Sequence, residues 1–357
     1  MAEVANEEKL QALMGQMVGH MTGTALCLGM WLGDELGLYR ELAKGPTGAD
    51  ALAKATRCSA RLVREWLDGQ AAGGLVTFDA AKDVYGLTPE AKLALADDGS
   101  PVFVARAMNT LRSLFIDGEK VAAAFRGDGA LAWGDHHPCL FSGTEWFFRT
   151  GYRAHLPTAW IPALEGVKAK LEKGARVADV GCGHGASSVV LAQAFPKTRF
   201  TGYDVHAPSI DTATRRATEA GVSDRVTFAT ATAKDYGAAN ERFDLICFFD
   251  CLHDMGDPVG AARHALARLA PDGTVLLVEP FALDGRADNV PKNPMAALLY
   301  TASATICTPN SLSQEGKAGL GAQAGEARLK RVFEEAGFTR FRRATATPLN
   351  LILEARP

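Results

Sequence analysis

The chain has 357 residues, and its hydrophobic residues, 47% of the total, are numerous enough for a normal buried core. This length favours two domains over one. The formal net charge is −3, so neither nucleic acid nor an anionic lipid surface would attract the chain as a whole. Its seven scattered cysteines indicate reduced thiols and a cytoplasmic protein, and no signal-peptide pattern opens the sequence.

The N-terminal residues predict helices that pack against a second subunit. The stretch from Leu10 to Gly33 has no Lys, Arg, Asp or Glu, and Gly15, Gly19 and Gly23 repeat the GxxxG spacing. Its length would also suit a membrane span, but polar residues such as His20 interrupt it. We therefore expect one or two helices at a homodimer interface, and no membrane contact.

Residues 36–95 predict a winged helix. The expected elements are helices at 47–55 and 59–73, strands at 75–78 and 84–87, and a helix capped by Thr88 with Pro89 in its first position. Arg57, Arg61 and Arg64 lie near the helix that would read DNA. From Asp34 to Asp98, however, eleven acidic residues outnumber eight basic ones, so we do not expect this segment to bind nucleic acid. We expect residues 1–98 to form a helical dimerisation domain.

Residues 99–172 predict a helical connector. Helices are expected at about 101–125 and 158–172, joined by a loop rich in glycine and aromatic residues. Within the loop, His136, His137 and Cys139 form a dense group, for which a solvated loop is favoured over a metal site.

The stretch from Ala175 to His206 carries the most informative pattern. It predicts a strand at 176–180, a tight turn with Gly181, Gly183 and Gly185, a helix at 186–195 and a second strand that ends at Asp204. Glycines let a ligand approach the backbone, and an acid at the end of the second strand can accept hydrogen bonds from both ribose hydroxyls. The glycines alone also fit a nicotinamide dinucleotide enzyme.

Strands and helices alternate over residues 173–357. The expected strands lie at 226–229, 243–249, 274–279, 338–345 and 349–355, and the expected helices at 260–269 and 326–336. The pattern predicts an α/β fold with a seven-stranded, doubly wound, Rossmann-like sheet. The last two strands are expected to close it as a hairpin, which makes the last strand antiparallel to the one before it. An insertion at 285–324 includes helical spacing at 293–307, which predicts either a substrate-facing helix and lid or plain packing under the sheet edge.

Two motifs resemble those of a known family. Asp179 with the three following glycines and Asp204 resembles motif I of class I S-adenosylmethionine-dependent methyltransferases. The segment from Asp250 to Pro258, DCLHDMGDP, resembles the LHDW-type motif of small-molecule O-methyltransferases. With both motifs and the predicted winged helix, the sequence is similar to a group of bacterial proteins that have an N-terminal winged helix and include mycobacterial members. The resemblance implies S-adenosylmethionine as cofactor, S-adenosylhomocysteine as product, and no metal.

The same resemblance implies a set of site residues. His253 would be the general base that removes the proton of an acceptor hydroxyl, and Glu279 or Asp254 would orient its imidazole. Residues expected to bind the cofactor are Tyr152, Arg153, Asp179, Gly181, Cys182, Gly183, Asp204, Val205, Thr232, Ala233, Phe249 and Asp250. Among them, Arg153 would pair with the methionine carboxylate, with a surface role as the alternative. Thr232 and Ala233 would meet the adenine, where many relatives have an acid; Asp235 is the nearest acid.

Three functions follow from this pattern. The first is O-methylation of a small hydroxylated or aromatic metabolite. The second keeps the cofactor but methylates nitrogen, sulfur or carbon. The third is a cofactor-sensing winged-helix transcriptional regulator, against which the acidity of the N-terminal segment argues.

Overall fold

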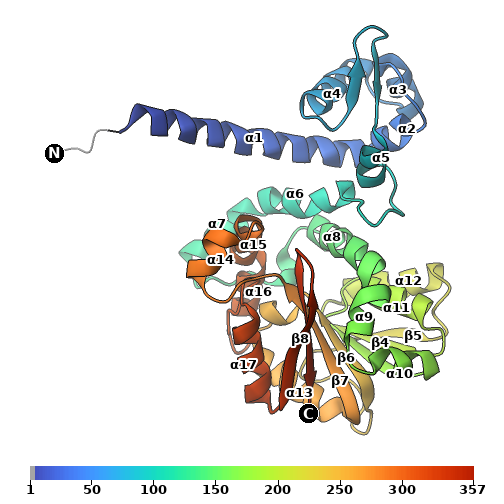
Figure 1. Cartoon of the computed structure of the whole chain (residues 1–357), viewed down its shortest axis with the longest axis vertical. Helices are drawn as coiled ribbons and strands as arrows, with labels where there is room; N and C mark the ends of the chain where they lie inside the picture. Colours follow the sequence, from blue (N-terminus) through green and yellow to red (C-terminus); the bar gives the residue numbers. More distant parts are fainter. Residues whose placement is uncertain (1–4) are drawn as a thin grey trace. The chain divides into compact units, whose positions relative to one another are not determined.

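A computed structural model describes residues 5–357, so the first four residues of the predicted 1–98 domain lie outside the described range. The chain divides into two units (Figure 1). The N-terminal unit comprises the residues up to Arg112 together with Ser142–Thr150. The C-terminal unit comprises Ser113–Phe141 together with Gly151–Pro357.

The N-terminal unit has the winged-helix arrangement that the sequence predicts. Its elements are α1 (Glu7–Glu35), α2 (Leu38–Leu42), α3 (Ala49–Thr56), α4 (Ala60–Ala72), the antiparallel strands β1 (Thr77–Asp79) and β2 (Val84–Gly86), α5 (Pro89–Leu95), η1 (Ala105–Ala107) and α6 (Met108–Ile116), which ends in the other unit. The Thr88 hydroxyl accepts a hydrogen bond from the Ala91 N–H at 3.1 Å and so caps α5, as predicted. Buried side chains of α2, α3 and α4, including Tyr39, Leu52 and Leu67, form one core with β2.

Helix α1 is a single helix with two different halves. Its C-terminal half packs closely on the unit, since a Cβ on Gly33 would lie 2.3 Å from the Tyr39 ring. Its N-terminal half is exposed, and a Cβ on Gly15, Gly19 or Gly23 would meet nothing within 4 Å. Despite its length, neither α1 nor any other helix within residues 5–357 is apolar enough to cross a membrane.

The C-terminal unit is built on a seven-stranded sheet, as the sequence predicts. Its strands are β3 (Arg176–Val180), β4 (Arg199–Asp204), β5 (Val226–Thr230), β6 (Phe243–Phe249), β7 (Leu269–Pro280), β8 (Arg340–Ala346) and β9 (Asn350–Arg356), in the order β5-β4-β3-β6-β7-β9-β8. The first five pair in parallel, and β9 lies antiparallel between β7 and β8. The last strand is therefore the antiparallel one.

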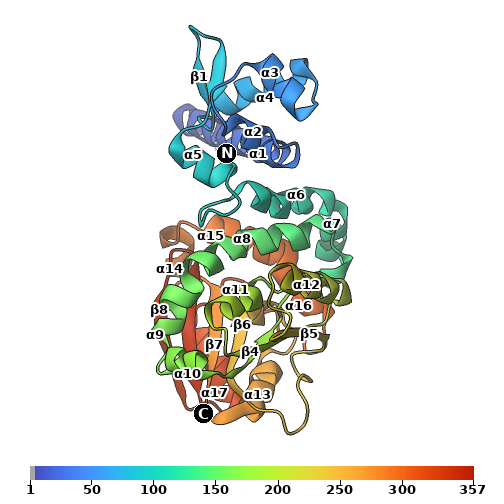
Figure 2. The same cartoon turned by 90° about the vertical axis from the view of Figure 1, so that its right-hand side faces the viewer.

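Helices cover both faces of this sheet (Figures 1 and 2). One face carries α10 (Val167–Lys173), α11 (Ala186–Ala194) and α12 (Ala207–Glu219), and the other carries α13 (Pro258–Arg268) and α17 (Glu326–Ala336). Apolar side chains one helical turn apart on α17, among them Leu329 and Phe333, are buried against the central strands. Gly337, at a φ of +105°, then ends α17 in the left-handed conformation.

The predicted connector was only partly right. A helix was expected at 101–125, but Asp117 separates α6 from α7 (Gly118–Arg126). The helix expected at 158–172 is divided into a π-helical turn η3 (Leu156–Trp160), α9 (Ile161–Ala163) and α10, with Gly166 at a φ of +71° before α10. The glycine and aromatic loop between them contains the short turn η2 (Trp133–Asp135) and then becomes helix α8 (Cys139–His155).

Helix α8 was missed because two of its glycines suggested a break. Gly143 has another function: a Cβ at this position would lie 2.2 Å from the Thr110 backbone nitrogen. The glycine therefore allows α8 and α6 to approach closely, and this packing outweighs its low helix propensity.

The insertion after β7 is helical. It contains α14 (Arg286–Lys292), α15 (Ala296–Ala302), the π-helical turn η5 (Ser303–Cys307) and α16 (Thr308–Ser313). The last three follow one another without a break, so the helical spacing predicted at 293–307 is present and continues to Ser313. A short turn η4 (Leu252–Asp254) follows β6 and lies against α16.

Candidate active site

The turn after β3 has an unusual backbone that only glycines adopt easily. Gly181, Gly183 and Gly185 have φ angles of +76°, +50° and +75°. A Cβ on Gly181 would lie 2.7 Å from the Cys251 sulfur, whereas a Cβ on Gly183 would meet no protein atom within 4 Å. Gly181 is thus required by packing, and Gly183 leaves its backbone open to a ligand.

Asp204 holds this turn from the end of β4. One of its carboxylate oxygens accepts a hydrogen bond from the Gly183 N–H and the other accepts one from the His206 N–H, each at 2.9 Å. Burial raises the pKa of Asp204, and the two backbone N–H groups oppose this. Each oxygen retains acceptor capacity, so the carboxylate can also accept two hydroxyl groups of a ribose.

Asp179 lies at the buried end of the same turn. Its Oδ2 accepts hydrogen bonds from the hydroxyls of Ser187 and Ser188, each at 2.6 Å, while its buried Oδ1 has no hydrogen-bond partner. Burial raises the pKa of Asp179 from 3.8 to about 6, although the serine hydroxyls oppose the shift. An unsatisfied carboxylate oxygen in a dry site is a good partner for a cationic ligand group.

His253 and Glu279 form a buried pair at the ends of β6 and β7. The His253 Nδ1 is hydrogen-bonded to Glu279 Oε2, and Glu279 Oε1 accepts the backbone N–H groups of Leu252 at 3.0 Å and His253 at 3.3 Å. The His253 and Glu279 residues are 3% and 1% exposed. Burial opposes protonation of the imidazole, but the Glu279 charge, with a contribution from Cys307, raises the pKa of His253 well above its ordinary value.

Asp254 does not share this contact. Within the described chain its carboxylate makes no hydrogen bond to the His253 ring; its backbone carbonyl instead accepts the side-chain amides of Asn310 at 3.3 Å and Gln314 at 3.1 Å. Burial raises the pKa of Asp254 to about 7. Of the two acids considered for orienting His253, Glu279 is the one that the structure brings to the imidazole.

Asp250 joins two elements that are far apart in the sequence. Its carboxylate accepts hydrogen bonds from the Tyr152 hydroxyl at 3.2 Å and the Asn350 amide at 2.7 Å, and its φ of +51° is strained for a residue with a side chain. The Tyr152 ring packs on Phe249, with 5.3 Å between ring centroids. Burial, followed by the charge of Glu279, raises the pKa of Asp250 well above its usual range. These residues line the same strand edge as the glycine turn.

The remaining predicted cofactor residues differ in their exposure. Arg153, Val205 and Thr232 are exposed, and Ala233 is half-buried. Thr232 belongs to a turn in which the Asp235 N–H donates to its carbonyl at 3.1 Å. Cys182 is buried, and burial raises the pKa of its thiol well above its ordinary value, so it contributes shape rather than charge.

Sequence reasoning missed an aromatic group beside Asp204. The Phe141 ring lies 4.7 Å from the His206 ring and 5.3 Å from the Trp133 ring, measured between centroids. The backbone N–H of Trp133 donates to Asn310 Oδ1 at 3.0 Å. The only sequence signal was the density of aromatic residues in a segment that was expected to be a loop.

The nearby histidine group is not a solvated loop, which corrects the prediction. His136 is 5% exposed, and its Nδ1 lies 3.1 Å from an Asp117 carboxylate oxygen. The His137 Nδ1 lies 3.1 Å from the Cys139 sulfur. Across residues 5–357, no group of three or more His, Cys, Asp or Glu side chains is arranged to hold a metal ion.

Comparisons with known protein families match both units. The model of a methyltransferase domain matches residues 152–340, and that of the Rv2258c-like winged HTH domain matches residues 24–96. The 27-O-demethylrifamycin SV methyltransferase of Amycolatopsis mediterranei is 31% identical over 126 residues, which are 34% of this chain and 46% of that protein. The ubiquinone biosynthesis O-methyltransferase of Actinobacillus pleuropneumoniae is 31% identical over 107 residues, 29% of this chain and 44% of that protein. The chain thus spans less than half the length of these curated relatives.

Solved structures resemble the chain over its whole length. The mitomycin 7-O-methyltransferase MmcR has a TM-score of 0.69 at 19% identity, covering 99% of this chain and 100% of that chain. Human N-acetylserotonin methyltransferase, solved in complex with S-adenosylmethionine, has a TM-score of 0.70 at 18% identity, covering 100% of this chain and 99% of that chain. At such identities, these similarities establish a shared fold and no more.

Proposed function

This chain belongs to the methyltransferase-domain family, and from that premise we propose that it transfers a methyl group from S-adenosylmethionine to a hydroxyl oxygen of a small, partly apolar molecule. The observation that carries the proposal is the buried pair of His253 and Glu279 on the strand edge that also carries the glycine turn. A base at that edge is needed for a hydroxyl acceptor, whose proton must leave as the new bond forms.

The residues around the turn fit the cofactor. The carboxylate of Asp204 retains acceptor capacity for the two ribose hydroxyls, and the open backbone at Gly183 allows close approach. The unsatisfied Oδ1 of Asp179 fits the ammonium group of the methionine part. When bound, the cofactor supplies an activated methyl group on a positively charged sulfur.

His253 would act on the acceptor hydroxyl. Glu279 fixes the ring through Nδ1, which leaves Nε2 to receive the proton. The same carboxylate stabilises the imidazolium that forms, so it increases the strength of the base. In this mechanism Glu279 is a positioning residue, and Tyr152 and Asp250 line the site. We also propose roles in cofactor binding for Arg153, Val205, Thr232 and Ala233 on the strength of the family resemblance.

The experiment compares binding with turnover. Calorimetry with S-adenosylmethionine and S-adenosylhomocysteine should show binding to the wild-type protein and much weaker binding to Asp204→Ala. With a panel of phenols and catechols as acceptors, His253→Ala should lose most of its methyl transfer while it keeps its affinity for S-adenosylhomocysteine. If neither cofactor form binds to the wild-type protein, the proposal is wrong. A His253→Ala variant that methylates a thiol or amine at the wild-type rate would favour the alternative of S- or N-methylation.

We propose further that the protein is a homodimer formed through α1. The exposed half of this helix carries a stripe of apolar residues, each at least 41% exposed, at helical spacing: Leu10, Leu13, Met14, Met17, Val18 and Met21. Gly15, Gly19 and Gly23 lie one turn apart and would let a second helix approach closely. A long apolar stripe without cover in its own chain marks an interaction surface.

The winged helix offers little support for a regulator that binds DNA. Two basic residues of α4 are already in ion pairs, Arg61 with Glu65 and Arg64 with Asp83. Phosphate binding would have to break these pairs within a segment of net negative charge. We propose instead that residues 1–98 serve dimerisation, residues 99–172 contribute to the pocket, and residues 173–357 bind the cofactor, with 285–324 on the substrate side.

A further inference from the structure

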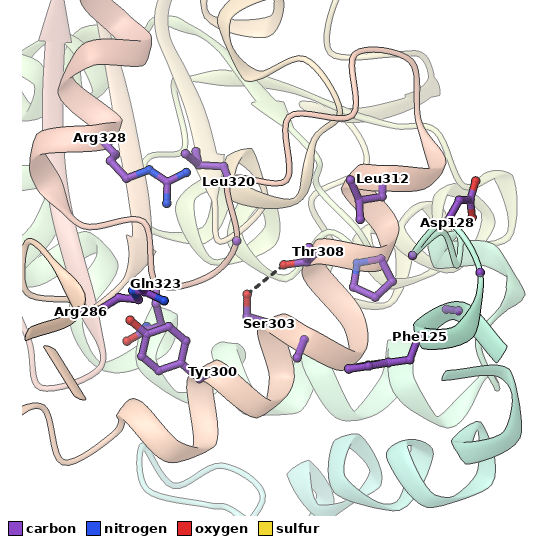
Figure 3. Close-up of a pocket in the computed structure, with 16 residues that line it drawn as sticks. Phe125, Asp128, Arg286, Tyr300, Ser303, Thr308, Leu312, Leu320, Gln323 and Arg328 are labelled. Atoms are coloured by element: carbon purple, nitrogen blue, oxygen red, sulfur yellow. Dashed lines mark hydrogen bonds between the residues drawn. The ribbon is translucent and has the colours of Figure 1, made fainter. Parts of the chain in front are cut away.

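The C-terminal unit contains a cavity that none of the residues named in the proposed reaction lines. It has a volume of about 620 Å³ and lies between the end of α7, the helix from α15 to α16, and the start of α17 (Figure 3). None of the glycine-turn residues, Asp204, His253 or Glu279 lines it. Its size falls in the range of small-molecule sites.

The cavity lies next to the active site. Residues of the helix from α15 to α16 serve the two regions separately: Ser311 donates to the Met255 carbonyl at 2.8 Å, whereas Ala304, Thr308 and Leu312 line the cavity. Gly321, also in the lining, donates its backbone N–H to the His253 carbonyl at 3.0 Å. The two regions are therefore neighbours that use different side chains of the same helix.

One end of the cavity presents hydrogen-bond donors. Arg286, Tyr300 and Arg328 lie together there, and the Arg328 guanidinium points into the space (Figure 3). Both arginines are exposed, and in the described chain neither takes part in an ion pair. The Tyr300 oxygen accepts the Asn289 amide at 3.3 Å, which leaves its own O–H to donate.

The other end is mainly apolar. Phe125, Leu312 and Pro309 line it, and Figure 3 shows Phe125 and Leu312 on the side away from Arg286 and Arg328. The one acid of the lining, Asp128, lies at this end and is paired with Lys317 at 3.8 Å. Two cations and a hydroxyl donor at one end, with apolar side chains at the other, match a molecule that has an anionic group on an apolar body.

We propose that this cavity binds a small organic anion, a carboxylate or sulfonate on an aromatic or aliphatic body, with the anionic group held by Arg286 and Arg328. Most of its lining belongs to residues 99–172 and 285–324, the segments proposed above for the pocket and the substrate side. It uses none of the residues proposed to bind the cofactor or to act on the acceptor, so its test does not depend on methyl transfer. An anion of this kind would meet charge-assisted hydrogen bonds, which are stronger than neutral ones.

The test is a fluorescence titration of the full-length protein with 8-anilinonaphthalene-1-sulfonate, carried out with and without saturating S-adenosylhomocysteine. The double variant Arg286→Gln/Arg328→Gln should weaken binding of the probe by about tenfold or more. Ala304→Trp, which fills the cavity, should abolish the same binding phase. The matched control is Arg331→Gln, which removes an exposed arginine from the same helix α17 but from outside the lining, and it should leave the affinity unchanged.

Competition separates charge from apolar contact. 2-Naphthoate should displace the probe, and the neutral 2-naphthamide should need a concentration at least about tenfold higher. The proposal is overturned if the double variant binds the probe within twofold of the wild type, or if the two competitors are equally effective. Displacement of the probe by S-adenosylhomocysteine would also overturn it, because the probe would then occupy the cofactor crevice.

Discussion

Replacing Asp179 with asparagine is expected to stabilise the ligand-free protein and to weaken its binding of S-adenosylmethionine. The carboxylate is 1% exposed, its Oδ1 has no hydrogen-bond partner, and burial raises its pKa from 3.8 to about 6. Keeping this group ionised at neutral pH therefore costs free energy in the folded state. Asparagine has nearly the same shape and can still accept from Ser187 and Ser188 through its carbonyl oxygen, but it carries no charge.

The size of the effect follows from the pKa. Each pKa unit corresponds to about 1.4 kcal/mol, so a rise from 3.8 to about 6 lowers the free energy of unfolding by about 3 kcal/mol at neutral pH. Because the folded-state pKa lies above the unfolded value, the folded protein binds the proton more tightly. The wild-type free energy of unfolding should therefore fall as the pH rises from about 4 to about 6 and then stay level, whereas the variant lacks this contribution.

Urea denaturation at a series of pH values between 5 and 8, without cofactor, measures this difference. We expect the variant to gain up to about 3 kcal/mol over the wild type at pH 7 and above, and less at pH 5. Calorimetry at pH 7.5 should show at least about tenfold weaker binding of S-adenosylmethionine, because the counter-charge for its ammonium is gone. Glu335→Gln, the same acid-to-amide change at an exposed position of α17, is the control and should change neither quantity. A variant that is less stable than the wild type at neutral pH, or that binds the cofactor equally well, would refute this reasoning.

Three other changes test the site and the dimer. Glu279→Gln removes the charge that raises the pKa of His253, so the acidic limb of the pH–rate profile should move to lower pH. The maximal rate should fall at least about tenfold, and an acidic limb that does not move would exclude His253 as the titrating base. Gly183→Ala places a methyl group where the backbone is open to a ligand, so it should weaken cofactor binding more than Gly181→Ala does. Both variants are strained by their positive φ, but only Gly181→Ala also clashes with Cys251, so it should lower the unfolding midpoint further; equal binding losses would contradict this division. Met21→Glu puts a charge on the exposed stripe of α1 and should convert a dimer to a monomer in light scattering, and a monomeric wild type would disprove the interface.

The sequence was most informative where short-range chemistry determines the structure. The glycine spacing predicted the turn at 181–185 because each of these residues needs a positive φ, a requirement that is local. The alternation of strands and helices predicted the elements of the sheet for the same reason, whereas the antiparallel last strand was predicted from the closing hairpin and the family resemblance. His253 and Glu279 are 26 residues apart, but His253 follows β6 and Glu279 lies at the end of β7. A doubly wound sheet places these two apolar strands side by side, so their meeting could be expected.

Contacts that depend on long-range packing could not be predicted in this way. Asn350 and Asp250 are 100 residues apart, and nothing near Asn350 in the sequence indicates a ligand site. Helix α8 was interpreted as a loop because the purpose of Gly143, its close contact with Thr110, is visible only after folding. The same is true of Asn310, whose contacts with Trp133 and Asp254 arise in α16, beyond the helical spacing predicted at 293–307.

The distribution of acids explains why this crevice suits a cation. The whole chain carries a net charge of only −3, yet Asp179, Asp204, Asp250 and Asp254 all lie at one sheet edge, and burial raises the pKa of each. Four carboxyl groups in a dry region destabilise the folded protein unless protons or a cationic ligand neutralise them. A ligand that bears both an ammonium and a sulfonium group can supply that neutralisation. Folding therefore imposes an electrostatic penalty on these carboxylates in the ligand-free protein. Binding of a cationic ligand relieves that penalty, and the relief contributes to the binding free energy.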